Sequence, residues 1–167
     1  FSQAKAEKKR IVLAEGEEDK VLHATQEVVS MGLAYPVLIG RTEIIKAKIK
    51  KLGLHIVAGQ DFDVIDNEHN SQHDELWKRY YSIMKRKGIT EAIAKRVVTS
   101  NTTVIASLLV EMGYADGLVC GLFGTYSRHL EAIRDIIGVK ESVKVPAALN
   151  SLVLPTGNVF ITDTYVN

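Results

Sequence analysis

One stretch of the chain combines residue types that bind anions with a backbone able to turn sharply. Residues 118–138 read LVCGLFGTYSRHLEAIRDIIG, in which an apolar run ends in a glycine-bracketed loop just before a helical pattern begins. Glycines let backbone N–H groups approach a ligand, hydroxyls and guanidinium groups donate to phosphate, and a helix N-terminus favours negative charge. The candidate phosphate- or CoA-binding residues are Gly121, Gly124, Thr125, Ser127, Arg128 and Arg134. An ordinary helix cap uses the same residue types, so the spacing alone leaves both interpretations open.

A second strand-to-helix turn, EGEED at 15–19, has the opposite charge. Its carboxylates complement the positive end of the following helix, at about 0.3–1 kcal/mol each, and they would repel a phosphate. We favour a self-capped helix here, with a metal ion or an adenine-ribose contact as the alternative.

The histidines and the cysteine do not form a metal-binding or nucleophilic pattern. His69 and His73 lie four residues apart, but their polar surroundings and the lack of a third ligand favour a solvated helix start. Cys120 ends an apolar strand and has no base placed beside it, which favours an inert thiol over a nucleophile. We therefore expect no metal site in this chain.

Short apolar runs alternate with helical patterns along most of the sequence. Strands are predicted at 11–14, 35–40 and 115–120, with 54–59 and 62–66 as further strands or edge segments. Helices are predicted at 16–32, 42–51, 71–87, 90–98, 101–112 and 130–137. This alternation predicts an α/β fold with a parallel sheet and right-handed crossovers. Two final strands, 147–154 and 159–166, are joined by a tight turn with Pro155 and Gly157, and they read as the opening of an incomplete part of the fold.

Composition narrows the range of partners. The 21 Lys and Arg residues balance 20 Asp and Glu residues, which indicates no nucleic-acid partner and no anionic membrane surface. A single cysteine excludes an internal disulfide and fits a reducing cytosol. No apolar run approaches the ~18 residues that span a bilayer. The first ten residues lack the hydrophobic core of an export signal and read as a linker or tail.

Several segments taken together resemble the phosphate acetyltransferase family over nearly the whole chain. They are RIVLAEGEEDKVLHA, MGLAYPVLIG, GITEAIA, MGYADGLVCG, the loop that ends in Arg128-His129-Leu130, Arg134 to Gly138, and FITDTYVN. The resemblance implies a three-layer αβα fold like that of isocitrate and isopropylmalate dehydrogenases, with a ligand cleft between two subdomains. It divides the chain into a tail at 1–10, subdomain 1 at 11–140, and the opening strands of a truncated subdomain 2 at 141–167. The family moves an acetyl group between CoA and phosphate and needs no metal or nucleotide cofactor.

Departures from the family pattern point to one branch of it. Ala14 stands where active members have Pro, Met84 where they tend to have Arg, and Phe123, Tyr126 and Arg128 where they have small or hydroxyl residues. The forms AEGEED, NTTVIASLLV and LVCG resemble instead the transacetylase-like C-terminal domain of bacterial NADP-dependent malic enzymes. That domain is similar to the enzyme but senses acetyl-CoA and helps to build the oligomer.

This resemblance implies a regulatory domain that binds acetyl-CoA as an effector and has no catalytic residue of its own. Arg134 matches the arginine that faces phosphate or CoA in the family. NADP and a divalent metal would serve the parent's other domain, which oxidatively decarboxylates malate to pyruvate, in a cytoplasmic homo-oligomer. The alternatives are an active phosphate acetyltransferase, a purely structural domain, and a dehydrogenase of the isocitrate type. The last has the least support, because the first turn lacks a dinucleotide fingerprint.

Overall fold

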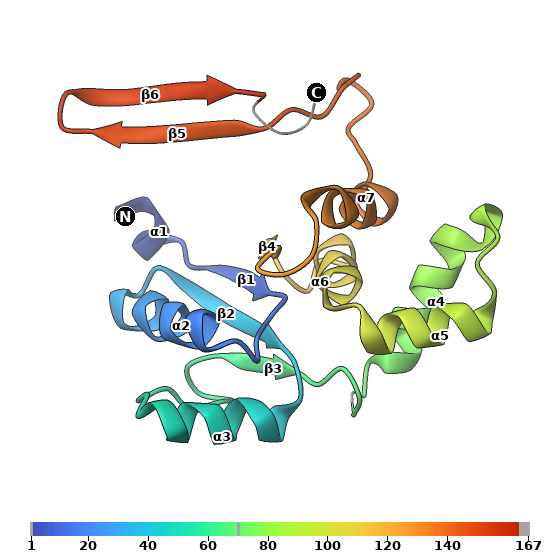
Figure 1. Ribbon diagram of the computed structural model, residues 1–167, viewed down its shortest axis with the longest axis horizontal. Coiled ribbons are helices and arrows are strands. Elements are labelled where there is room, and N and C mark those ends of the chain that lie inside the picture. The colour runs from blue at the N-terminus through green and yellow to red at the C-terminus, as the bar shows by residue number, and fades with distance from the viewer. Residues whose placement is uncertain (1, 70, 164–167) are drawn as a thin grey trace. The chain divides into compact units, whose positions relative to one another are not determined.

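The computed structural model describes residues 2–69 and 71–163. The chain divides into two compact units, Phe1–Ile137 and Gly138–Asn167. The first is a mixed α/β unit, and the second carries an antiparallel hairpin (Figure 1). A short helix, α1 (Ser2–Ala6), and the first residues of β1 lie inside the predicted tail. The boundary of the family's subdomains at residue 140 stays a prediction.

The first unit is built on a four-stranded parallel sheet. The strands are β1 (Lys9–Leu13), β2 (Ala34–Ile39), β3 (Asp63–Ile65) and β4 (Gly117–Val119), in the spatial order β3-β2-β1-β4. The chain thus winds outward from β1 through β2 to β3 and then returns to the other side of β1 as β4. The reversal makes the carboxyl ends of β1 and β4 a topological switch point, where ligands bind in open α/β sheets.

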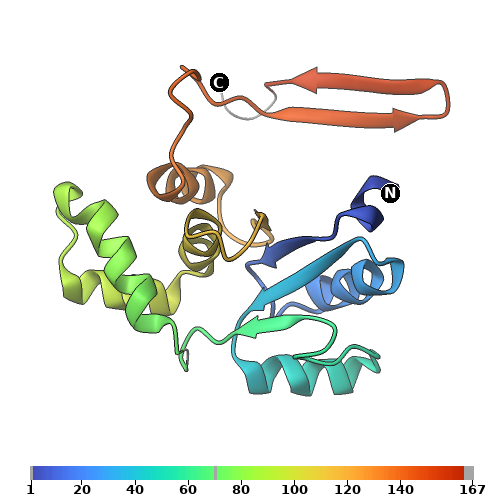
Figure 2. The ribbon, with the colours of Figure 1, turned by 180° about the vertical axis from the view of Figure 1, so that it is seen from behind.

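Helices cover both faces of this sheet, which confirms the predicted three-layer αβα architecture (Figures 1 and 2). The helices of the unit, after α1, are α2 (Asp19–Met31), α3 (Thr42–Leu52), α4 (His73–Met84), α5 (Glu91–Ser100), α6 (Thr102–Glu111) and α7 (Tyr126–Ile136), with a 3-10 turn at Lys85–Lys87. Alternate residues of β2 enter different cores, because successive side chains of a strand point to opposite faces. Leu38 packs on the side of α2 and α3, whereas Val37 and Ile39 pack with α4, α5 and α6.

Helix α6 is the most deeply buried helix of the unit. All seven residues from Thr103 to Leu109 are buried, and the helix contacts β1, β2, β4 and α7. Its N-cap is Asn101, whose side chain accepts a hydrogen bond from the Val104 N–H, and Thr90 caps α5 in the same way. An apolar helix held at a fixed position in this way can serve as the wall behind a site.

Two predicted elements differ from the structure. The segment 54–59 is not a strand: a single bridge joins Ala58 to Phe62, while Ile56 and Phe62 anchor the segment in the core beside α3. Apolar residues therefore mark burial here rather than sheet pairing. The helix predicted to begin at Leu130 begins at Tyr126, because the polar residues before Leu130 already belong to its first turn.

The hairpin of the second unit follows the prediction. β5 (Leu149–Leu154) pairs with β6 (Gly157–Thr162), and Pro155 and Thr156 form the turn between them. The predicted continuation of the last strand over 164–166 lies outside the described residues. Apolar side chains occupy both faces of the ribbon, and Leu149, Val153 and Phe160 are each more than 60% exposed.

A carboxylate at the end of β3 ties together two backbone segments. Asp66 accepts hydrogen bonds from the N–H groups of Thr42 (2.8 Å), Glu68 (3.0 Å) and His69 (2.9 Å). Burial opposes ionisation of Asp66, but these N–H groups outweigh it and lower the carboxyl pKa to about 2. Helix α3 has no side-chain cap of its own at Arg41, and Asp66 supplies one from the end of the neighbouring strand β3.

Replacing Asp66 with Asn is expected to destabilise the chain by about 1–2 kcal/mol at pH 6. The folded-state pKa lies below the unfolded value, so the contribution is complete above about pH 4 and is lost as the pH falls toward 2. Chemical denaturation followed by the fluorescence of Trp77, the only tryptophan of the chain, measures the difference. Glu43→Gln, at an exposed carboxylate in the first turn of the same helix, is the control. A difference between wild type and variant that is the same at pH 6 and pH 2.5 would contradict this account.

Candidate functional site

The loop after β4 lies against the turn after β1, as the sheet order requires. The Ala14 N–H donates to the Val119 carbonyl (3.0 Å), and the Gly121 N–H donates to Glu15 Oε1 (2.9 Å). Glu15 therefore binds the beginning of the candidate loop instead of capping its own helix. The structure brings the two turns compared in the sequence into one place, at the switch point of the sheet.

The loop wraps around the side chain of His129. The Nε2 atom lies 2.6 Å from the Phe123 carbonyl oxygen, and Nδ1 lies 2.8 Å from the hydroxyl of Thr103. Thr103 is 3% exposed and belongs to the buried helix α6. Sequence reasoning missed both roles of this pair and that of Glu15. His129 stood within the quoted loop, but no local pattern connects it with a threonine 26 residues earlier.

Four of the six candidate residues lie together in the loop and at the N-terminus of α7. Gly121 and Gly124 have positive φ angles of 102° and 91°. Thr125 is the N-cap residue, yet its hydroxyl makes no cap hydrogen bond and lies 3.3 Å from the hydroxyl of Ser127. Among the residues that the structure describes, no side chain caps this end of α7, and two exposed hydroxyls lie at its positive dipole end.

The two candidate arginines lie apart from this group. Arg128 lines a cavity of about 350 Å³ between α7 and the helices α4, α5 and α6, together with Tyr80 and Met84. Arg134 lies in the last turn of α7, about 9 Å further along the helix axis. Within the part of the chain that the structure describes, neither guanidinium has a hydrogen bond or an ion pair. Both charges are available to a ligand, but they do not converge with the loop hydroxyls.

The acidic turn at 15–19 is held by cations from the neighbouring helix. Arg41 donates Nε (2.9 Å) and Nη2 (2.8 Å) to the two carboxylate oxygens of Glu17, and its backbone N–H also binds Glu17. The Arg41 side chain is the main cause of the lowered pKa of Glu17. Asp19 pairs with Lys48 at 3.0 Å. These contacts connect the turn after β1 with α3, so the acidic residues act mainly as structural links.

A cavity of about 220 Å³ lies at the carboxyl ends of β1 and β2. It is lined mainly by the turn after β1, including Glu15 and Gly16, by the segment after β2, and by Thr102 at the start of α6, with Phe123 from the loop after β4. Cys120 lies nearby, where burial and then the charge of Glu15 raise the pKa of its thiol. A thiol with a raised pKa is a poor nucleophile at neutral pH, which favours the inert cysteine predicted from the sequence.

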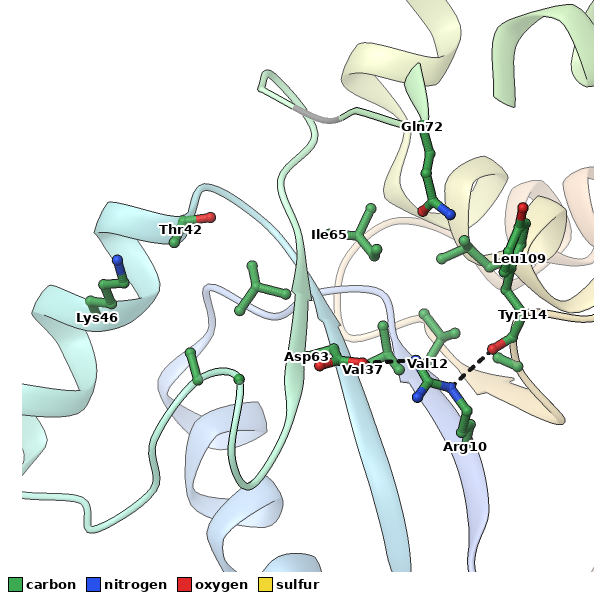
Figure 3. A pocket seen from close by; sticks show the side chains of 14 residues that line it. Arg10, Val12, Val37, Thr42, Lys46, Asp63, Ile65, Gln72, Leu109 and Tyr114 are labelled. Atoms are coloured by element: carbon green, nitrogen blue, oxygen red, sulfur yellow. Dashed lines mark hydrogen bonds and ion pairs between the residues drawn. The ribbon is translucent and has the colours of Figure 1, made fainter. Parts of the chain in front are cut away.

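A larger cavity, of about 530 Å³, lies on both sides of the edge strand β3 (Figure 3). Arg10 lines this cavity and donates hydrogen bonds to the Asp63 carboxylate (2.8 Å) and to the Tyr114 carbonyl (3.1 Å). Because both donor groups are satisfied within the protein, Arg10 acts as a brace between β1, β3 and the end of α6. None of the residues that line this cavity belongs to the turn after β1 or to the loop after β4, so we do not assign the candidate site to it.

No helix among the described residues is both long enough and apolar enough to cross a bilayer. The aromatic side chains of the loop are exposed on the surface of the α/β unit, Phe123 at 60% and Tyr126 at 51%.

Comparison with known proteins identifies the family. A family model described as phosphate acetyl/butaryl transferase matches residues 1–167. The chain is 70% identical, over its whole length, to an NADP-dependent malic enzyme from Haemophilus influenzae, of which it spans 22%. It is 32% identical over 152 residues to a phosphate acetyltransferase from Clostridium acetobutylicum, covering 91% of this chain and 44% of that protein. The EutD phosphotransacetylase from Staphylococcus aureus superposes with a TM-score of 0.86 at 23% identity, covering 99% of this chain and 49% of the other. The higher identity to the malic enzyme confirms the branch that the sequence indicated. Because the family model matches the whole chain, this chain belongs to the phosphate acetyl/butaryl transferase family.

Proposed function

We propose that the chain is a regulatory domain of an NADP-dependent malic enzyme and that it binds acetyl-CoA as an allosteric effector. The observation that carries this proposal is the identity of 70% to a malic enzyme, against 32% to a phosphate acetyltransferase. The remainder of the parent protein, with NADP and a divalent metal, would oxidatively decarboxylate malate to pyruvate. The parent would be a cytoplasmic homo-oligomer that this domain helps to assemble.

The chemistry of the loop supports an anionic ligand such as CoA. Three features favour phosphate groups: the N-terminus of α7, the hydroxyls of Thr125 and Ser127, and the charges of Arg128 and Arg134, which pair with no other described residue. Phe123 adds an exposed aromatic face beside the cavity at the end of β1. A CoA molecule offers both phosphates and an aromatic base, so these features match different parts of one ligand.

The same loop supports binding without acetyl transfer. Transfer between a thiol and phosphate requires both reactants to be held in line, with charge stabilised where it develops. In this chain the two arginines do not converge with the loop hydroxyls, and bulky side chains occupy the loop. A second reactant would therefore lack a defined position, whereas one large ligand can still be held by separate contacts.

The alternative is an active phosphate acetyltransferase, which would convert acetyl-CoA and phosphate to acetyl phosphate and CoA. The match of the family model to the whole chain favours it. The two proposals differ in turnover, because a regulatory domain binds acetyl-CoA without consuming it.

In the full-length protein, acetyl-CoA is expected to change the malate concentration at half-saturation by about fivefold or more, since allosteric coupling is typically 5–150-fold. NADPH formation from malate, followed by absorbance with and without acetyl-CoA, measures this effect. Arg134→Ala should reduce the response, while Arg96→Ala, an exposed arginine on α5, should leave it unchanged. The release of acetyl phosphate from acetyl-CoA and phosphate is expected to stay at background, and robust turnover would establish the alternative.

A second expectation concerns assembly. The hairpin β5–β6 exposes apolar side chains on both faces, and a two-stranded ribbon of this kind is marginally stable in water without a partner. Removing this chain from the full-length protein should therefore lower the oligomeric state in sedimentation velocity. Val153→Lys, at a residue 80% exposed on one face of the ribbon, should shift the same equilibrium toward smaller species. An unchanged sedimentation coefficient for both variants would contradict a role in oligomerisation.

A further inference from the structure

We propose that His129 is a positioning residue of the candidate site, which holds the loop 121–125 in its binding conformation without contacting the ligand itself. The inference rests on the proposed function for the identity of the ligand. The conformation of the loop can be measured without any ligand, so the two proposals can fail separately.

The hydrogen bonds of His129 show which of its ring nitrogens must donate. A carbonyl oxygen can only accept, so the nitrogen 2.6 Å from the Phe123 carbonyl must carry the proton. Nδ1 lies 2.8 Å from the Thr103 hydroxyl and is hydrogen-bonded to it. Both ring nitrogens are used inside the protein, which leaves none for a ligand or for proton transfer.

The loop backbone is shaped to surround this ring. A Cβ atom added to Gly124 would lie 3.0 Å from Nε2 of His129, which is closer than side-chain carbons ordinarily approach. Gly124 also has a φ of 91°, a conformation that residues with a side chain rarely adopt. Both the shape and the conformation of the loop therefore depend on glycine facing the imidazole.

Three separate elements anchor the loop. Glu15, after β1, binds the Gly121 N–H; His129, on α7, binds the Phe123 carbonyl; and Thr103, on the buried helix α6, fixes His129. Thr103 lies on α6, which is packed in the core. The imidazole, bound to Thr103, therefore holds the exposed loop at a fixed position relative to the core. A loop ordered in advance loses less conformational entropy when it binds its ligand.

The test compares His129→Ala and His129→Gln with wild type in the full-length protein. Hydrogen exchange of peptides covering 120–127 reports loop order, and calorimetry with acetyl-CoA reports affinity. We expect His129→Ala to lose exchange protection in the loop, with protection of α6 and the sheet retained, and to weaken affinity by about tenfold. The glutamine side chain can still donate to the Phe123 carbonyl, so His129→Gln should restore part of both signals. His55→Gln is the matched control, because His55 is exposed and far from His129 in the sequence. It should change neither loop exchange nor affinity.

Each outcome decides the proposal. Unchanged loop exchange in His129→Ala would overturn it, and so would a glutamine variant that is no better than alanine in both measurements. If wild type does not bind acetyl-CoA but the alanine variant still loosens the loop, the positioning role stands and the proposed ligand is wrong. If His129→Ala unfolds the domain, Thr103→Val decides instead: it removes only the hydroxyl that orients the ring, and an unaltered loop in that variant would overturn the proposal.

Discussion

The central position of β1 determines the arrangement of everything else in the α/β unit. This strand pairs in parallel with β2 on one side and β4 on the other, and Val12 and Ala14 are completely buried. A parallel strand with neighbours on both sides needs helices on both faces, because its side chains leave the sheet alternately in both directions. The winding of the chain must then reverse at β1, which places the turn after it beside the loop after β4. The contact between Glu15 and Gly121 follows from this topology.

Much of the fold was predictable from the sequence, because the signals concerned are local. Thr90 and Asn101 cap the helices that they precede, and the alternation of short apolar runs with helical patterns indicated a parallel sheet. The segment 54–59 was assigned wrongly, because apolar periodicity reports burial and does not distinguish a strand from a packed irregular segment. The start of α7 was placed late, because hydroxyl residues and arginine belong equally well to a loop or to the first turn of a helix.

The candidate site was predictable only in part, because its organisation depends on contacts between distant residues. Glycines and hydroxyls in the loop were visible in the sequence, and the structure brings four of the six candidates together at one helix end. The ordering of the loop by Glu15, Thr103 and His129 connects residues separated by up to 106 positions. Arg128 and Arg134 are six positions apart on α7. They do not face the same way, because six residues are not a whole number of turns of an α-helix.

The alternation along β2 has a consequence for how this chain can change during evolution. Leu38 belongs to the core beside α2 and α3, whereas Val37 and Ile39 belong to the core on the opposite face. Inserting or deleting one residue in β2 would reverse the face to which the following side chains point and put each of them into the wrong core. Length variation among homologues should therefore be absent from β2 and concentrated in segments such as 53–61, whose backbone does not pair within the sheet. The two cores thus constrain the length of this strand to the residue.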